Sequence, residues 1–175
     1  MIEVNFLDLI KNKSFGPIKI GDKKDFVIQT LGQPDSFSNP DFNPEYYDAI
    51  LYDWYELNFR QDKLNSISNS HILNWAKNWR FNRKFHYQNE NFKVTSWFKK
   101  PSIDTQLKNI KKKLDQEKVI YSESIFYDSV KLTVGKDLEL LFSSELSYHK
   151  EPQEWTKIDS KILNLRLCNF HLLDN

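Results

Sequence analysis

Residues 49–67 read Ala-Ile-Leu-Tyr-Asp-Trp-Tyr-Glu-Leu-Asn-Phe-Arg-Gln-Asp-Lys-Leu-Asn-Ser-Ile, and this stretch decides the fold class. Aromatic and branched apolar residues dominate it, and these residue types are enriched in β-strands. The polar triplet Gln61-Asp62-Lys63 separates a first part that ends at Phe59 from a second part that runs from Leu64 to Ile67. Polar residues between two apolar runs favour a turn, so the stretch predicts antiparallel strands.

A short helix is predicted before these strands. Asp22 is a candidate N-cap, because its carboxylate can accept a backbone N–H of the first turn. Gly32 can adopt the left-handed conformation that ends a helix, and Pro34 prevents its continuation. The residues expected on its apolar side are Phe26, Val27 and Leu31.

A second helix is predicted after Pro101, with Ser102 as its cap. Its apolar side is formed by residues spaced four, three and four apart, namely Ile103, Leu107, Ile110 and Leu114. Four later apolar runs predict strands at 119–121, 130–134, 138–142 and 162–167, with a hairpin turn at 135–137. Between the two helices, residues 71–98 predict a further helix followed by a strand.

These elements together predict an α+β fold in which antiparallel sheets pack against a few helices. A helix followed by several strands occurs twice, which indicates two similar halves of the kind α plus β-meander, at 16–70 and 98–168. The length of 175 residues suits a single domain over 1–175. A content of 39% hydrophobic and 15% aromatic residues is typical of a chain that folds into a globular domain.

Charge and cysteine content bear on the cellular setting. The formal net charge is +1, so no overall field attracts the protein to nucleic acid or to an anionic membrane. Cys168 is the single cysteine, which excludes an internal disulfide framework and suits a reducing compartment. Glu3 and Asp8 interrupt what would be the apolar part of a signal peptide, and no apolar run reaches the length of a membrane span. We therefore expect a cytoplasmic protein.

Motifs for catalysis or metal binding are missing from the sequence. The four histidines have no zinc-ligand spacing, and a lone cysteine cannot supply a zinc cluster. The four glycines form no phosphate-binding loop, and there is no Gly-x-Ser-x-Gly nucleophile motif. We therefore expect a protein that is not an enzyme and that carries no cofactor or metal. A small enzyme whose site is assembled from distant residues stays open as an alternative.

The charges are segregated along the chain. Residues 25–59 contain seven carboxylates and no lysine or arginine, whereas residues 60–100 carry nine basic residues against Asp62 and Glu90. The acidic segment includes a predicted loop at 33–48 that holds several aromatic residues. Acidic side chains beside rigid aromatic rings are typical of a surface that binds a basic protein.

Two other interpretations of the charge pattern remain open. The acidic segment can pair inside the fold with the basic one, in which case its rings belong to the core. The basic segment 75–100 can instead bind nucleic acid, with Lys77, Arg80, Arg83 and Lys84 on the phosphates. The helical spacing of Trp75 and Trp79 favours a core position over base stacking, so nucleic acid is the less favoured partner.

A family resemblance adds to this interpretation. The runs Ile18-Lys19-Ile20-Gly21 and Leu31-Gly32-x-Pro34, with Phe26-Val27 between them, are followed by residues 52–59 and by Leu64 and Ile67. Over roughly residues 16–68 this pattern resembles small bacterial immunity proteins of polymorphic or contact-dependent growth inhibition toxin systems. The resemblance implies a cytoplasmic, non-enzymatic protein that binds one cognate toxin domain, often a nuclease with a basic surface, and no catalytic residue carries over.

We therefore hypothesise that the protein neutralises a toxin by occluding it. The residues expected to contact the toxin share an acidic or aromatic side chain within the acidic segment. They are Asp35, Phe37, Asp41, Phe42, Glu45, Tyr46, Tyr47, Asp48, Asp53 and Glu56.

Overall fold

The computed structural model describes residues 1–37, 48–69, 86–126, 129–143 and 165–174. Its contacts group into two compact units, Met1–Trp97 with His171–Asn175, and Phe98–Phe170. Helices accompany mostly antiparallel strands in both units, which confirms the α+β class. The helix predicted early in the segment 71–98 lies outside the described residues.

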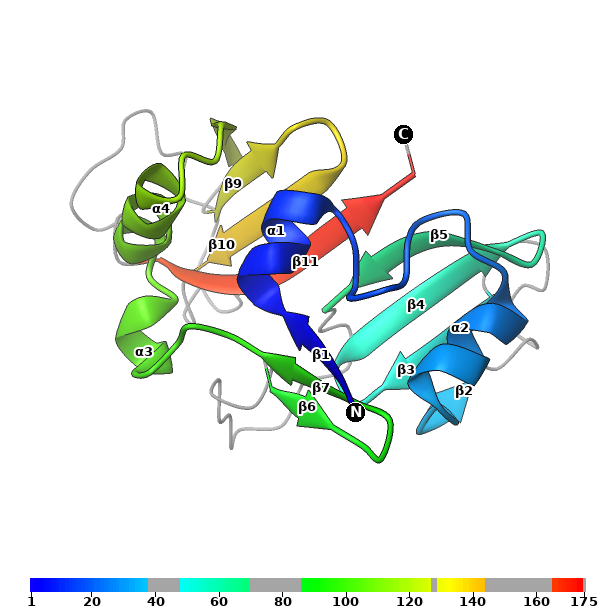
Figure 1. The fold of residues 1–175 in the computed structure, drawn as a ribbon. Coiled ribbons are helices and arrows are strands. Elements are labelled where there is room, and N and C mark those ends of the chain that lie inside the picture. Colours follow the sequence, from blue (N-terminus) through cyan, green and yellow to red (C-terminus); the bar gives the residue numbers. More distant parts are fainter. Residues whose placement is uncertain (38–47, 70–85, 127–128, 144–164, 175) are drawn as a thin grey trace, which may run out of the picture. The chain divides into compact units, whose positions relative to one another are not determined.

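The first unit begins with a strand and two helices and continues with strands (Figure 1). Its elements are β1 (Ile2–Asn5), α1 (Phe6–Asn12), α2 (Lys24–Leu31), β2 (Ser36–Phe37), β3 (Asp48–Tyr52), β4 (Tyr55–Arg60), β5 (Lys63–Ser68), β6 (Tyr87–Gln88) and β7 (Phe92–Thr95). The second unit contains α3 (Pro101–Asp104), α4 (Leu107–Gln116), β8 (Tyr121–Phe126), β9 (Ser129–Val134) and β10 (Leu138–Ser143). The last strand, β11 (Arg166–Leu173), belongs to the second unit up to Phe170 and to the first from His171.

The first unit contains a meander in which β2, β3, β4 and β5 pair in chain order, each antiparallel to the next. The hairpin predicted at 61–63 is confirmed, because Gln61 and Asp62 both have positive φ, as a tight two-residue turn requires. Residues His171–Leu173 continue this sheet beside β5. A smaller sheet has β7 at its centre, with β1 parallel to it and β6 antiparallel.

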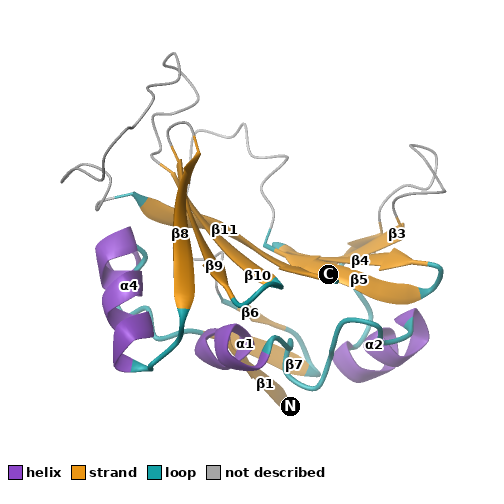
Figure 2. Ribbon diagram, turned by 90° about the horizontal axis from the view of Figure 1, so that it is seen from above, coloured by secondary structure: helices purple, strands orange, loops and turns teal. Residues whose placement is uncertain are grey.

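The core of the first unit is aromatic. Figure 2 shows α1, α2 and the small sheet on one face of the meander. On that face, Phe92 has its ring centroid 5.2 Å from that of Tyr52 and 5.8 Å from that of Phe15, and Phe15 lies 5.2 Å from Tyr55. All four residues are buried. Residues alternate along β4, so Tyr55, Leu57 and Phe59 face this core and the residues between them face the opposite side.

The second unit repeats the order of helix and meander. Strands β8, β9 and β10 pair antiparallel in chain order, and β11 lies beside β10. The predicted hairpin at 135–137 is confirmed by the pairing of Leu138 with Val134. The apolar side of α4 is buried through Leu107, Ile110 and Leu114, as its spacing predicted.

The predicted start of the first helix is wrong by one residue. Lys23 occupies the N-cap without a side-chain hydrogen bond. The carboxylate of Asp22 instead accepts the backbone N–H of Lys19 at 2.8 Å, so it stabilises the preceding turn. Phe26, expected on the apolar side, is 46% exposed, because the buried stripe of this short helix is formed by Val27 and Leu31.

The predicted second helix is divided in two. Ile103 belongs to α3 and is 48% exposed, whereas α4 begins after its N-cap, Gln106. The break has a tertiary cause, because the N–H of Leu107 donates to the carbonyl of Leu165 at 2.8 Å and the carbonyl of Thr105 accepts from Leu167 at 2.8 Å. A segment that bonds to another strand in this way cannot continue a helix.

Other boundaries also differ from the sequence prediction. The predicted loop 33–48 includes the short strand β2, and the strand predicted at 119–121 begins only at Tyr121. The last predicted strand is found as β11, and its first residues, 162–164, lie outside the described part. No helix within the described residues is long and apolar enough to cross a membrane.

Candidate functional site

Two of the predicted contact residues lie at the edge of the meander, on or next to β2. Asp35 and Phe37 are exposed, and the Phe37 ring is 56% exposed on a strand of only two residues. β2 is the outermost strand of the meander in the strand order. We call Lys24, Asp35, Phe37 and Asp48 the β2 surface.

Lys24 on α2 joins Phe37 and Asp48 of the β2 surface. Its ammonium lies 2.5 Å from a carboxylate oxygen of Asp48. The same ammonium lies 5.7 Å from the ring centroids of Phe37 and of the buried Phe59, a distance at which a cation is attracted to the ring face. Asp48 is therefore neutralised internally, by a lysine that precedes the acidic segment in the sequence.

Asp35 is held by two hydrogen bonds. One carboxylate oxygen accepts the backbone N–H of Asp53 at 2.7 Å, and the other accepts the Tyr87 hydroxyl at 3.2 Å. Burial and the neighbouring carboxylate of Asp35 raise the pKa of Tyr87 to about 12. The hydroxyl therefore stays protonated at neutral pH and fixes the direction of Asp35. Asp53, at the β3–β4 turn, is also exposed.

Glu56, another predicted contact residue, does not belong to the β2 surface. It lies on the face of β4 opposite the aromatic core, where it is half-buried. Burial raises the pKa of the Glu56 carboxyl, and a hydrogen bond from the Asn58 side chain partly offsets this effect.

The remaining predicted contact residues, Asp41, Phe42, Glu45, Tyr46 and Tyr47, lie outside the described part of the chain, as do the basic residues proposed for nucleic acid, Lys77, Arg80, Arg83 and Lys84. Of the aromatic residues that are described in the acidic segment, Tyr52, Tyr55 and Phe59 are buried. Burial raises the pKa of Tyr52 and Tyr55, and the Tyr52 hydroxyl donates to the Gly32 carbonyl at 2.7 Å. These three rings belong to the core, whereas Phe37 is exposed.

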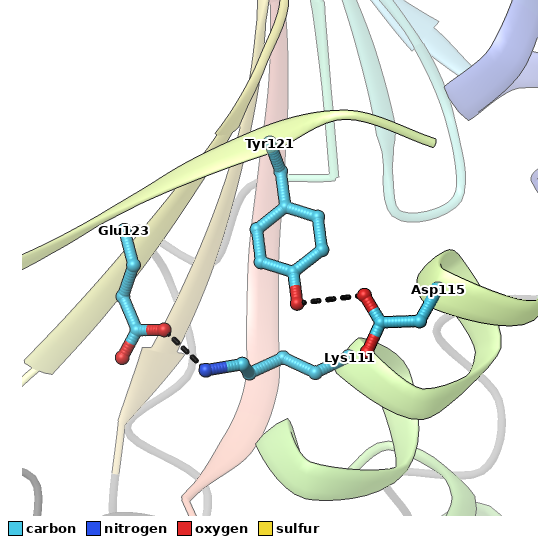
Figure 3. Close-up of polar contacts among 4 residues, drawn as sticks. All are labelled: Lys111, Asp115, Tyr121 and Glu123. Carbon is cyan, nitrogen blue, oxygen red and sulfur yellow. Dashed lines mark hydrogen bonds and ion pairs between the residues drawn. The ribbon is translucent and has the colours of Figure 1, made fainter. Parts of the chain in front are cut away.

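A polar network connects α4 to β8 in the second unit (Figure 3). The Lys111 ammonium lies 2.5 Å from Oε2 of Glu123, and the Tyr121 hydroxyl donates to Asp115 at 3.1 Å. Oε1 of Glu123 is buried and accepts no hydrogen bond from the described residues. These side chains pair with one another across the helix and the strand, which is the arrangement of a structural contact.

The described residues contain no candidate metal cluster. No group of three or more His, Cys, Asp or Glu side chains is placed to hold a metal ion in that part of the chain. Cys168 lies on β11, as predicted, and its thiol donates to the Leu141 carbonyl at 3.2 Å.

Sequence reasoning missed Lys24 and Tyr87 as parts of the site. Both lie outside the acidic aromatic segment, 24 and 52 residues from the carboxylates they contact. Their basic and aromatic character was visible, but their proximity depends on α2 and β6 packing near β2 and β3.

No family model and no curated protein matches the sequence. Among solved structures, the chain is similar to an extracellular protein containing an SCP domain from Bacillus anthracis str. Ames, at 10% sequence identity and a TM-score of 0.35. The match covers 89% of this chain and 44% of that protein, so the chain spans less than half of its length.

Proposed function

We propose that this protein is a cytoplasmic immunity protein, which binds a cognate bacterial toxin with a basic surface and neutralises it by stoichiometric occlusion, without catalysis. The β2 surface and the acidic residues 41 and 45 form the contact. The proposal combines the sequence resemblance with the position of one side chain, Phe37.

The exposure of Phe37 is the observation that carries the proposal. A phenylalanine ring that is 56% exposed leaves apolar area in water, and aromatic rings are common anchors of protein interfaces. The ring lies on an edge strand, with the Lys24 ammonium 5.7 Å from its centroid.

The carboxylates around Phe37 supply long-range electrostatic attraction for the basic surface of the toxin. Asp35 and Asp53 are exposed beside each other, and the hydrogen bonds to Asp35 restrain its side chain. Exposed charges of one sign accelerate association with a partner of opposite sign and make the rate depend on salt. Asp48 contributes less to this field, because Lys24 neutralises it.

The experiment co-expresses this protein with the product of the adjacent reading frame and measures survival, co-purification and affinity. Phe37→Ser should weaken toxin binding by roughly 30-fold, the loss typical of an interface anchor. Phe26→Ser is the matched control, since Phe26 is the other exposed phenylalanine among the described residues and lies two residues from Lys24, on a different side of α2. It should leave binding unchanged.

Charge is tested separately with Asp41→Lys and Glu45→Lys combined, while Asp48 is kept because it pairs with Lys24. This variant should slow association, and a control with Asp8→Lys and Asp174→Lys, both exposed elsewhere, should not. A neighbour that is harmless alone, or a toxin bound equally well by the Phe37 variant, would contradict the proposal.

A further inference from the structure

β8 is the last strand of its sheet, and within the described part of the chain only β9 pairs with it. All six of its residues stay in register with β9 without a bulge, and the strand contains neither lysine nor proline. Edge strands are usually protected by one of these features or by being short, as β2 is with two residues. β8 therefore presents a regular row of backbone donors and acceptors, which another β-strand can satisfy.

The corresponding edge of the first unit is covered by the chain itself. β2, from the connection that follows α2, pairs with the outer edge of β3. The two units correspond here, because in each a lysine of the helix pairs with a carboxylate of the following strand, Lys24 with Asp48 and Lys111 with Glu123. Only residues 117–120 connect α4 to β8, too few for a turn and a further strand. This connection therefore leaves the β8 edge open.

The side chains of β8 divide between its two faces. Tyr121 and Glu123 point towards α4 and bond to it (Figure 3). Residues alternate along a strand, so Ser122 and Ser124 lie on the other face, where both are exposed. Ile120, which precedes the strand, is 87% exposed. The open edge thus carries two small side chains beside one large apolar side chain in water.

We infer that β8 pairs antiparallel with β8 of a second copy of this chain, about a twofold axis at Ser122. Paired residues in a continuous sheet share a face, so the axis passes at a residue position. An axis at Glu123 would set two carboxylates directly opposite each other, which is destabilising. An axis at Ser122 instead sets Glu123 opposite Tyr121 of the second copy, and Ile120 opposite Ser124 of the second copy.

Charge and apolar burial both favour this register. Glu123 is the only charged residue of β8, and Lys111 already neutralises it, so a second strand meets little repulsion. Ile120 leaves water against the small Ser124 of the second copy, which is favourable for an apolar side chain. A single strand pair is smaller than the interface of about 1,600 Å² that is typical of stable complexes. The dimer should therefore be weak, with a Kd on the order of 100 μM.

The test is sedimentation equilibrium of the full chain from about 10 μM to about 1 mM, a range that brackets this Kd. The wild type should pass from monomer to dimer. Ser122→Lys sets two ammonium groups opposite each other at the axis and should weaken the dimer at least about tenfold. Thr133→Lys is the matched control, because Thr133 lies opposite Ser122 on β9 and receives the same charge one strand further in. Its two copies lie about 14 Å apart, beyond the Debye length of about 8 Å at physiological salt, so the control should still dimerise.

A mixture of two variants tests the register. Ser122→Glu should also be monomeric alone, whereas an equal mixture of Ser122→Lys and Ser122→Glu should dimerise at least as well as the wild type, since opposite charges then meet at the axis. Circular dichroism verifies that each variant is folded. A wild type that stays monomeric, a dimer that persists in Ser122→Lys, or a mixture that stays monomeric would overturn the inference. The dimer involves no residue of the β2 surface, so this test is independent of the toxin experiment.

Discussion

Lys111 of α4 and Glu123 of β8 form an ion pair of 2.5 Å, with only 26% and 16% of the side chains exposed. A second contact, from Tyr121 to Asp115, runs beside it (Figure 3). Four residues of helix span about 6 Å and two residues of strand about 6.6 Å, so Lys111 and Asp115 match the spacing of Glu123 and Tyr121. The two contacts thereby fix the register of α4 along β8.

Removing the lysine should destabilise the second unit. Lys111→Met leaves the partly buried Glu123 carboxylate without its cation, and we expect a loss of about 1–2 kcal/mol in the free energy of unfolding. Urea denaturation followed by circular dichroism measures this loss. Lys113→Met is the matched control, because its i,i+4 pair with Glu117 joins α4 only to its own C-cap residue and should contribute only about 0.3–0.5 kcal/mol. Equal losses in the two variants would show that the helix–strand pair has no special role.

Stability should fall in alkali because the pKa of the Tyr121 hydroxyl is raised in the folded state. Burial and the carboxylate of Asp115 raise the pKa of Tyr121 to about 12, above its ordinary value of 10.0. The folded state therefore retains this proton longer than the unfolded state, and the stabilisation is complete below pH 10 and lost as the pH rises towards 12. Tyr121→Phe should lose less stability than the wild type between pH 8 and pH 11 in urea denaturation. An identical pH dependence would refute the assignment.

Glu56→Gln should stabilise the protein at neutral pH. The raised pKa means that the folded state favours the protonated carboxyl, so its contribution is complete below the ordinary value of 4.5 and declines as the pH rises through the folded pKa. Glutamine keeps the shape and can still accept from Asn58, so we expect a gain of about 1 kcal/mol at pH 7 and almost none at pH 4. Thermal unfolding at both pH values measures it, and a loss of stability at pH 7 would contradict the burial argument.

Replacing Gly32 with alanine should destabilise the fold. Its φ of 87° and ψ of −176° lie in a region that only glycine occupies readily, and an added Cβ would meet the Asn91 amide nitrogen at 2.1 Å. Gly32→Ala should therefore cost about 2–3 kcal/mol in the free energy of unfolding. Gly21→Ala is the control, because Gly21 also has a positive φ, of 93°, but nothing within 4 Å of the added Cβ. A cost at Gly32 no greater than at Gly21 would exclude the steric contribution of Asn91.

The local features of the fold were predictable because they depend on neighbouring residues. Alternation of apolar residues along β4 and turn residues at 61–62 define a hairpin within one short stretch. The pairing of β1 with β7 was not predictable, because it joins Val4 to Val94 and parallel partners need no pattern in the connecting chain.

The candidate site likewise has a part that the sequence predicted and a part that it could not predict. The sequence identified Asp35 and Phe37 from the composition of one segment, and both are exposed. It could not separate Phe37 from Phe59, since both are aromatic residues of the same segment and only the packing of α2 and the core buries one of them.

The amino-acid sequence by itself determined the α+β class, the helix with its meander in each half and the segregation of charge, because periodicity and turn preferences act over a few residues. Tertiary structure alone decided that Lys24 neutralises Asp48, that Tyr87 fixes Asp35 and that residues 105–107 interrupt a helix. Each of these contacts joins residues far apart in the chain, and its free energy exists only once the intervening segments have folded.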